Sequence, residues 1–321
     1  MKEFQLIRQI QRETSVFPSS DSAPGVKLGI GDDAAVLEVP VGQHLVAATD
    51  TLNAGTHFPD NTPPSDIAYK CLAVNLSDLA AMGATPRWAL LSLSLPGADS
   101  EWVRSFAEGF RSLALVHGVA LVGGDTTSGP LSVSLTALGL VEPGKQLMRS
   151  GANPGDLLVI SGTIGGAARV LELLQAGKHA KERYLLDRPQ PRVKLGQALV
   201  GYASACIDVS DGLLADLGHV LKASGCGACV EIEKLPQADV LAGLEDEPKW
   251  NYQLSGGDDY ELLFTLPRCH EALITTWSQQ LDIPLSIIGE IEEGEGVRCI
   301  SPDGSAYDPG CAGFEHFRQK A

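Results

Sequence analysis

The chain has 321 residues, 44% of them hydrophobic, which is enough for a substantial buried core and for about two domains of roughly 150 residues each. Its 24 Lys and Arg residues against 40 Asp and Glu residues give a net charge of −16, which opposes binding to nucleic acid or to an anionic membrane surface. The sequence contains no apolar run of about 18 residues, no signal-peptide pattern and no disulfide framework among its seven cysteines, so we expect a cytoplasmic protein with reduced thiols.

The first half of the chain is predicted to mix strands and helices. Ser65-Asp66 is a typical helix N-cap, and Gly83 follows the last turn of the same predicted helix. The predicted elements are an amphipathic helix at the N-terminus, strands at 26–30, 36–39 and 45–51, helices at about 65–82 and 101–117, and strands at 119–122 and 132–137.

A segment rich in Gly and Pro, residues 142–156, has no apolar period and predicts a domain boundary, giving domains 1–145 and 146–321. The second half is predicted to contain a strand at 157–160, a helix ending at Gln175, a helix at 213–223 and a strand at 260–266. Neither half has a regular βαβ repeat, so the predicted class is α+β.

Aspartates recur beside Gly, Ser or Thr at predicted turns, strand ends and helix positions. A single such aspartate is usually a turn residue or a cap, because its side chain bonds the nearby backbone. Nine of them form a pattern: Asp32, Asp33, Asp50, Asp78, Asp125, Asp208, Asp211, Asp258 and Asp259.

Asp78 is the aspartate that a turn does not explain. It continues a largely apolar stripe through Cys71 and Val74 on a helix that we expect to be buried nearly all round. A buried carboxylate needs a compensating cation, and Lys70 lies about two turns away, where it could pair only indirectly. Metal ligation is therefore favoured over a structural ion pair.

Many carboxylates and few histidines favour a hard, oxygen-binding cation such as Mg²⁺, which commonly links carboxylates to substrate phosphates. The P-loop pattern and the protein-kinase patterns are absent. The segment Gly29–Ala34 matches GxGxx[GA], but a strand-like run follows it where the dinucleotide motif requires a helix.

Two further segments remain open. Cys226-Gly-Ala-Cys229 lacks the second cysteine pair of a zinc site and favours a helix-to-strand connection. The glycines of segment 162–166 could seat an anion at a helix N-terminus or could permit close packing.

Taken together, the glycine–aspartate blocks resemble the thiamine-monophosphate kinase family, within the superfamily of aminoimidazole ribonucleotide synthetase and selenophosphate synthetase. The resemblance covers nearly the whole chain. The blocks are GIGDD (29–33), TDTL (49–52), GTHF (55–58), AVNLSDLAAMGA (73–84), GGDT (123–126), RSGANPGD (149–156), IDVSDG (207–212) and SGGDDYELLF (255–264).

The resemblance implies ATP-dependent phosphorylation of thiamine monophosphate to thiamine diphosphate by direct in-line transfer, with no protein nucleophile. It also implies a homodimer in which the sheet of the N-terminal domain, which binds ATP and metal, pairs with that of a second subunit. The C-terminal domain is expected to complete the nucleotide and substrate site.

Site residues are carried over by matching blocks. Several Mg²⁺ ions would be held by Asp33, Ala48 through its carbonyl group, Thr49, Asp50, Asp78, Asp125, Asp208 and Asp211. ATP would contact Gly124, Asp125, Arg149 and Ser210, and thiamine monophosphate would contact His57, Asp258 and Phe314. Asp258 stands where many family members have Glu, and its shorter arm predicts a changed contact or an inserted water.

The sequence also bears on three alternative functions. Another superfamily enzyme could act on an aminoimidazole precursor or on selenide, but selenide chemistry normally uses an N-terminal cysteine, and none of the first 70 residues is Cys. A non-catalytic regulator could bind Mg-ATP with the same aspartates and would show no turnover. A glycoside hydrolase is disfavoured, because 18 aromatic residues leave little for sugar stacking.

Overall fold

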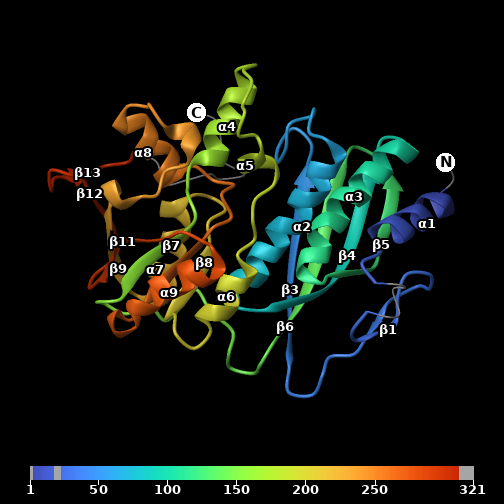
Figure 1. Cartoon of the computed structure of the whole chain (residues 1–321), viewed down its shortest axis with the longest axis horizontal. Helices are drawn as coiled ribbons and strands as arrows, with labels where there is room; N and C mark the ends of the chain where they lie inside the picture. The colour runs from blue at the N-terminus through green and yellow to red at the C-terminus, as the bar shows by residue number, and fades with distance from the viewer. Residues whose placement is uncertain (1–2, 18–22, 311–321) are drawn as a thin grey trace. The chain divides into compact units, whose positions relative to one another are not determined.

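The computed structural model describes residues 3–17 and 23–310, which form two compact units (Figure 1). Unit 1 contains the described residues up to Leu79 together with Ala84–Lys145, and unit 2 contains Ala80–Gly83 and the described residues from Gln146 onward. Both units combine helices and strands without regular alternation, which confirms the α+β class. None of the described helices is long and apolar enough to cross a membrane.

Unit 1 is built on a four-stranded sheet with the strand order β3-β6-β4-β5. β6 pairs antiparallel with both β3 and β4, whereas β5 runs parallel to β4. In Figure 1, α2 and α3 lie over one face of this sheet. The elements are α1 (Glu3–Thr14), β1 (Val26–Leu28), β2 (Val36–Leu37), β3 (His44–Asn53), α2 (Pro64–Ala81), β4 (Thr85–Leu95), α3 (Ser100–His117), β5 (Ala120–Ser128) and β6 (Ser132–Val141).

The helix ends follow from the sequence. The side chain of Asp99 accepts a hydrogen bond from the Glu101 amide (2.9 Å), which begins α3, and Gly118 ends it with a φ of 65°. Every residue from Ile67 to Ser77 is buried, which confirms that α2 is enclosed nearly all round.

Strands β4 and β5 differ from expectation. The sequence did not predict β4, whose second residue, Pro86, lies where the pairing with β6 is irregular, a place at which a strand tolerates proline. β5 was expected to end before Gly123, but it continues to Ser128, because Gly124 pairs with Leu91 of β4. A Cβ on Gly124 would lie 1.8 Å from the Leu91 carbonyl oxygen, so the close pairing requires glycine there.

Unit 2 contains a seven-stranded sheet with the order β13-β12-β9-β11-β7-β10-β8. β10 lies between β7 and β8 although it is the last of the three in the chain. The elements are β7 (Leu157–Ser161), α4 (Gly166–Gln175), α5 (Tyr184–Asp187), α6 (Val193–Leu199), β8 (Ala205–Asp208), α7 (Leu213–Ser224), β9 (Gly227–Glu231), η2 (Ile232–Lys234), η3 (Asp239–Leu241), α8 (Asp246–Ser255), β10 (Leu262–Leu266), η4 (Arg268–His270), α9 (Ala272–Leu281), β11 (Leu285–Glu292), β12 (Gly296–Ile300) and β13 (Ala306–Tyr307).

Candidate functional site

Two carboxylates from different elements of unit 1, Asp50 on β3 and Asp78 on α2, are hydrogen-bonded to each other. Burial raises the pKa of Asp50, and the bond from Asp78 offsets part of that rise. Two carboxyl groups can share such a bond only while one of them carries a proton. A divalent cation can replace that proton, and carboxylate oxygens are the ligands that Mg²⁺ prefers, so this pair fits a magnesium site.

The two faces of β3 have different roles. Successive side chains of a strand point to opposite faces, so Ala48 and Asp50 share one face and Thr49 lies on the other. The Thr49 hydroxyl donates to the Leu135 carbonyl (3.1 Å) and lies 3.0 Å from the Thr136 hydroxyl. Thr49 and Ala48 can therefore serve a cation beside Asp50 only through their backbone carbonyl groups.

His57 lies in the connection between β3 and α2, and both its backbone and its ring are held. The Asn53 amide donates to Nδ1 of the ring (3.0 Å), and the ammonium of Lys70, only 2% exposed, donates to the His57 carbonyl (3.1 Å). Because Nδ1 accepts a hydrogen bond, the neutral ring carries its proton on Nε2. Sequence reasoning did not assign this role to Lys70.

Asp33 lies exposed in the corner between β1 and β2, where its amide donates to the Asp32 carboxylate (2.9 Å). A strand, β2, follows the corner. The GxGxx[GA] match therefore lacks the helix that a dinucleotide site requires.

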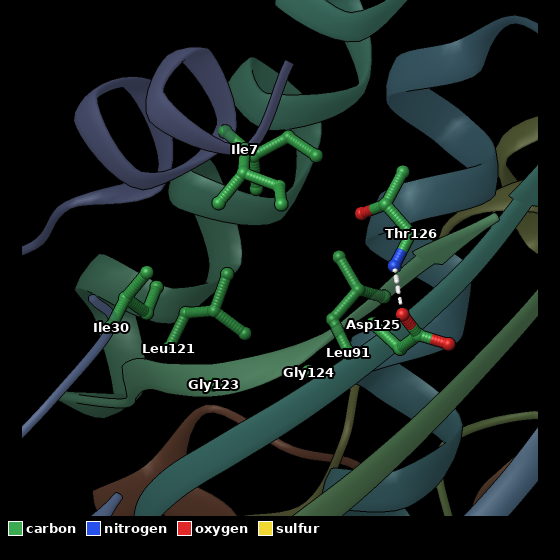
Figure 2. Close-up of a pocket in the computed structure, with 9 residues that line it drawn as sticks. Ile7, Ile30, Leu91, Leu121, Gly123, Gly124, Asp125 and Thr126 are labelled. Carbon is green, nitrogen blue, oxygen red and sulfur yellow. Dashed lines mark hydrogen bonds between the residues drawn. The ribbon is translucent and has the colours of Figure 1, made fainter. Parts of the chain in front are cut away.

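An apolar pocket of about 90 Å³ adjoins Gly124 and Asp125 (Figure 2). Figure 2 shows aliphatic side chains from α1, β4 and β5 on its walls, with the Asp125 carboxylate near one end. That carboxylate accepts a hydrogen bond from the Thr126 amide (2.8 Å), so its orientation is fixed locally. The lining residues are Ile7, Ile10, Ile30, Leu91, Leu121, Gly123, Gly124, Asp125 and Thr126.

In unit 2, one carboxylate organises the loop that follows β8. Asp216, on the first turn of α7, accepts hydrogen bonds through Oδ2 from the amides of Ser210 (2.9 Å), Asp211 (3.0 Å) and Gly212 (3.2 Å). Burial and the charge of Asp208 raise the pKa of Asp216 to about 7, although two of these backbone bonds act against the rise. The sequence signal for Asp216 was an acidic residue in the first turn of the predicted helix.

The same loop offers a candidate cation site. Ligand atoms of Asp211, Asp216 and His219 all lie within 4.8 Å of one another. Asp208, at the end of β8, is 4% exposed, and its charge acts on Asp216. Asp208 and Asp211 therefore belong to one acidic cluster.

The segment that carries Asp258 packs against this loop. The Asp258 amide donates to the Ser210 carbonyl (2.9 Å), and a Cβ on Gly257 would lie 2.4 Å from the same oxygen. The Tyr260 hydroxyl donates to Oδ1 of Asp258 (3.1 Å). The predicted residues Ser210, Asp211 and Asp258 thus lie side by side in unit 2.

The glycines of segment 162–166 make room for carboxylates of the protein itself. Oδ2 of Asp259 accepts the Gly165 amide (2.7 Å) at the start of α4, and a Cβ on Gly162 would lie 1.9 Å from the Glu261 carboxylate. Glu261 also bonds Arg192 and the Ser161 hydroxyl (2.5 Å). The glycines therefore permit close packing, and a carboxyl group of the protein itself, that of Asp259, occupies the N-terminus of the helix.

Three further features predicted in the second half of the chain are Arg149, Phe314 and the Cys226–Cys229 segment. Arg149 is exposed and lies beside β8, because the preceding carbonyl group, that of Met148, accepts the Cys206 amide (2.9 Å). Phe314 lies outside the described residues. Cys226 follows the Gly225 cap of α7 and leads into β9, which confirms the helix-to-strand connection.

Comparisons with known proteins agree along the chain. Residues 31–141 match the AIR synthase related protein N-terminal domain, and residues 153–301 match its C-terminal domain. The thiamine-monophosphate kinase of Salmonella typhimurium is 44% identical over 301 residues, covering 91% of this chain and 92% of the relative.

Solved structures show the same likeness. The crystal structure of thiamine-monophosphate kinase from Stenotrophomonas maltophilia K279a has 45% identity and a TM-score of 0.87, covering 96% of this chain and 98% of that one. AaThiL, complexed with AMPPCP and TMP, has 32% identity and a TM-score of 0.75, covering 98% of this chain and 97% of that one.

Proposed function

The chain belongs to the thiamine-monophosphate kinase family of AIR synthase related proteins, and from this premise we propose that it converts ATP and thiamine monophosphate to ADP and thiamine diphosphate. The observation that carries the proposal is the hydrogen-bonded carboxyl pair of Asp50 and Asp78, a fit for Mg²⁺ in a unit that also holds the Gly124–Asp125 segment. A phosphotransferase needs such cations, because its ATP carries several negative charges.

Mg²⁺ would be held in unit 1 by carboxylates and backbone oxygens, and in unit 2 by the cluster after β8. When bound, it would neutralise phosphate charge and orient the phosphoryl groups. The proposed ligands are Asp33, the carbonyl groups of Ala48 and Thr49, Asp50, Asp78 and Asp125 in unit 1, and Asp208 and Asp211 in unit 2.

For ATP, we propose that the Gly124–Asp125 segment contacts the nucleotide and that the adenine ring packs against the aliphatic side chains of the neighbouring pocket. A flat, weakly hydrated base suits such a pocket, because its burial removes apolar surface from water. Arg149 suits bidentate contact with phosphate oxygens, and the Ser210 hydroxyl can donate to another.

For thiamine monophosphate, we propose contacts with His57, Asp258 and Phe314. The Nε2 proton of His57 suits donation to a substrate oxygen. The Asp258 carboxylate suits the amino group of the pyrimidine ring, and an aromatic face at Phe314 suits the cationic thiazolium ring.

The chemistry requires no protein nucleophile. A non-bridging phosphate oxygen of thiamine monophosphate attacks the γ-phosphorus of ATP, and the bond from that phosphorus to the β–γ bridging oxygen breaks, so that ADP leaves with its electron pair. The attacking oxygen is already anionic, so no strong general base is needed. The side chains named above align the reactants and stabilise charge, which supplies most of the catalysis in phosphoryl transfer.

The test is chromatographic. Purified protein is incubated with Mg-ATP and thiamine monophosphate, and thiamine diphosphate and ADP are quantified, with EDTA in a parallel sample. We expect equal amounts of the two products and none with EDTA. Binding of Mg-ATP without any diphosphate would contradict the proposal and would favour the non-catalytic regulator.

We also propose a homodimer that forms through the free edge of β3, and a cytoplasmic location. β3 is a terminal strand of its sheet, it is ten residues long, and its Leu45 side chain is 48% exposed. A long, exposed strand edge is a template for pairing with another chain.

The described cysteines are free, and the chain carries no membrane-spanning helix in its described part, which suits the proposed cytoplasmic location.

A further inference from the structure

Three described residues other than glycine have a positive φ angle: Asp258 (71°), Tyr260 (53°) and Asp282 (54°). Asp282 caps the end of α9, where a left-handed residue is common. Asp258 and Tyr260 belong instead to the segment Gly256–Tyr260, which we call the strap. A non-glycine residue keeps this conformation only where its surroundings hold it there.

Backbone bonds hold the strap against the loop after β8. The Asp258 amide donates to the Ser210 carbonyl (2.9 Å), and the Tyr260 amide donates to the Val209 carbonyl (2.8 Å). The Val209 amide in turn donates to the Glu261 carbonyl (2.8 Å). The strap is therefore fixed to the loop on both sides of Asp259.

Asp259 anchors the middle of the strap. Its Oδ2 accepts the Gly165 amide (2.7 Å), and its carboxylate also bonds the Ala167 amide, at the N-terminus of the ten-residue helix α4. This side chain is therefore held by a helix 94 residues away in the chain.

Asp258 and Tyr260 meet through their side chains. The Tyr260 hydroxyl donates to Oδ1 of Asp258 (3.1 Å), and both residues are partly exposed. A phenol that donates to one oxygen restricts rotation of the carboxylate and leaves its negative charge in place. The bond joins side chains two residues apart, one on each side of the anchored Asp259.

We propose that Tyr260 is a positioning residue, which holds the Asp258 carboxylate so that it accepts a hydrogen bond from the amino group of the substrate's pyrimidine ring. This inference rests on the proposed function. If Tyr260 holds Asp258 in this way, the two residues make the protein prefer a pyrimidine ring with an amino group over a ring with a carbonyl group at the same position. An oriented carboxylate only accepts hydrogen bonds, so a carbonyl oxygen would face it with a second acceptor.

The test compares thiamine monophosphate with oxythiamine monophosphate, which has a carbonyl group in place of the amino group, in the wild type and in Tyr260→Phe. We expect Tyr260→Phe to raise KM for thiamine monophosphate about five- to tenfold, as for the loss of one typical hydrogen bond, with kcat and the KM for ATP within about twofold of wild type. We expect the preference in kcat/KM for thiamine monophosphate over the oxo analogue to fall by about the same factor.

Tyr252→Phe is the matched control, because it removes a phenol that bonds Arg169 (3.1 Å), and we expect it to leave the preference unchanged. In an Asp258→Asn background, Tyr260→Phe should have no further effect on the preference. The inference would be overturned by an equal loss of kcat/KM on both substrates or by an unchanged KM for thiamine monophosphate. It would also be overturned if Asp258→Asn and Tyr260→Phe had additive effects on the preference. Absence of turnover in the wild type would overturn the proposed function itself, and the substrate named here with it.

Discussion

The carboxylate of Asp78 lies on a helix whose preceding residues, from Ile67 to Ser77, are all buried, so its charge must be balanced inside unit 1. Asp78 shares one hydrogen bond with Asp50. One turn earlier on α2, the Asn75 side chain is fully buried, and its Oδ1 has no hydrogen-bond partner among the described residues. This part of the helix therefore has more acceptor oxygens than donors, which favours a cation.

Asp78→Asn tests the balance of charge at this point. The amide keeps the shape of the side chain but removes the negative charge, so we expect a folded protein whose kcat falls by about two orders of magnitude or more. Mg²⁺ should raise the melting temperature of the wild type more than that of the variant. Asp66→Asn, in the first turn of the same helix, is the control and should retain activity. Unchanged turnover in Asp78→Asn would remove Asp78 from the metal site.

Sequence reasoning predicted residues whose own neighbours carry the signal and missed residues whose role depends on a contact that only the fold creates. Asp78 was singled out because its apolar stripe is visible within eleven residues of sequence. Lys70, Asp216 and Asp259 act through backbone groups of loops that only the fold places beside them. No local pattern reports which carbonyl or amide a buried charge will meet.

At the scale of elements, α4 begins at a carboxylate supplied by another segment. Gly165 precedes the helix and offers no capping side chain, and Asp259 takes that place through the Gly165 and Ala167 amides. Burial raises the pKa of Asp259 well above 3.8 despite these two bonds, and the charges of Glu261 and Asp258 add to the rise. The helix start is therefore sensitive to pH.

The direction of this pH dependence follows from the linkage between proton binding and folding. An acid with a raised pKa binds its proton more tightly in the folded state, so its contribution to the free energy of unfolding is full below about pH 3.8 and is lost as pH rises through the folded value. We expect the wild type to lose unfolding free energy relative to Asp259→Asn as the pH rises above 3.8 and through the raised pKa of the folded state. Urea unfolding of both proteins across this range measures the difference, and parallel curves would contradict it.

The strands show where element prediction fails. β6 alternates in burial over most of its length and was predicted, although it extends beyond the expected range. β4 contains Pro86, and β5 contains two successive glycines, which ordinarily argue against a strand. Their pairing with each other and with β6 overrides this local preference, because the missing side chain at Gly124 is what admits Leu91.

At the scale of the whole molecule, the proposed dimer can be tested at β3. Leu45→Lys places a charge on the exposed strand, and we expect it to convert a dimer of twice 33.8 kDa to a monomer in size-exclusion chromatography with light scattering. Leu115→Lys is the matched control, because Leu115 is 46% exposed on α3, and it should remain dimeric. A wild type that is monomeric at micromolar concentration would contradict the proposed pairing.

The position of β10 has a consequence for synthesis of the chain. Unit 1 is complete once the ribosome has passed Lys145, so its sheet can form early. In unit 2, β7 and β8 emerge long before the strand that separates them, and they have no shared neighbour until Leu266 has been translated. A nascent chain stopped before that residue therefore exposes two apolar strand edges, so we expect unit 2 to depend on completed translation, and on chaperones, more than unit 1 does.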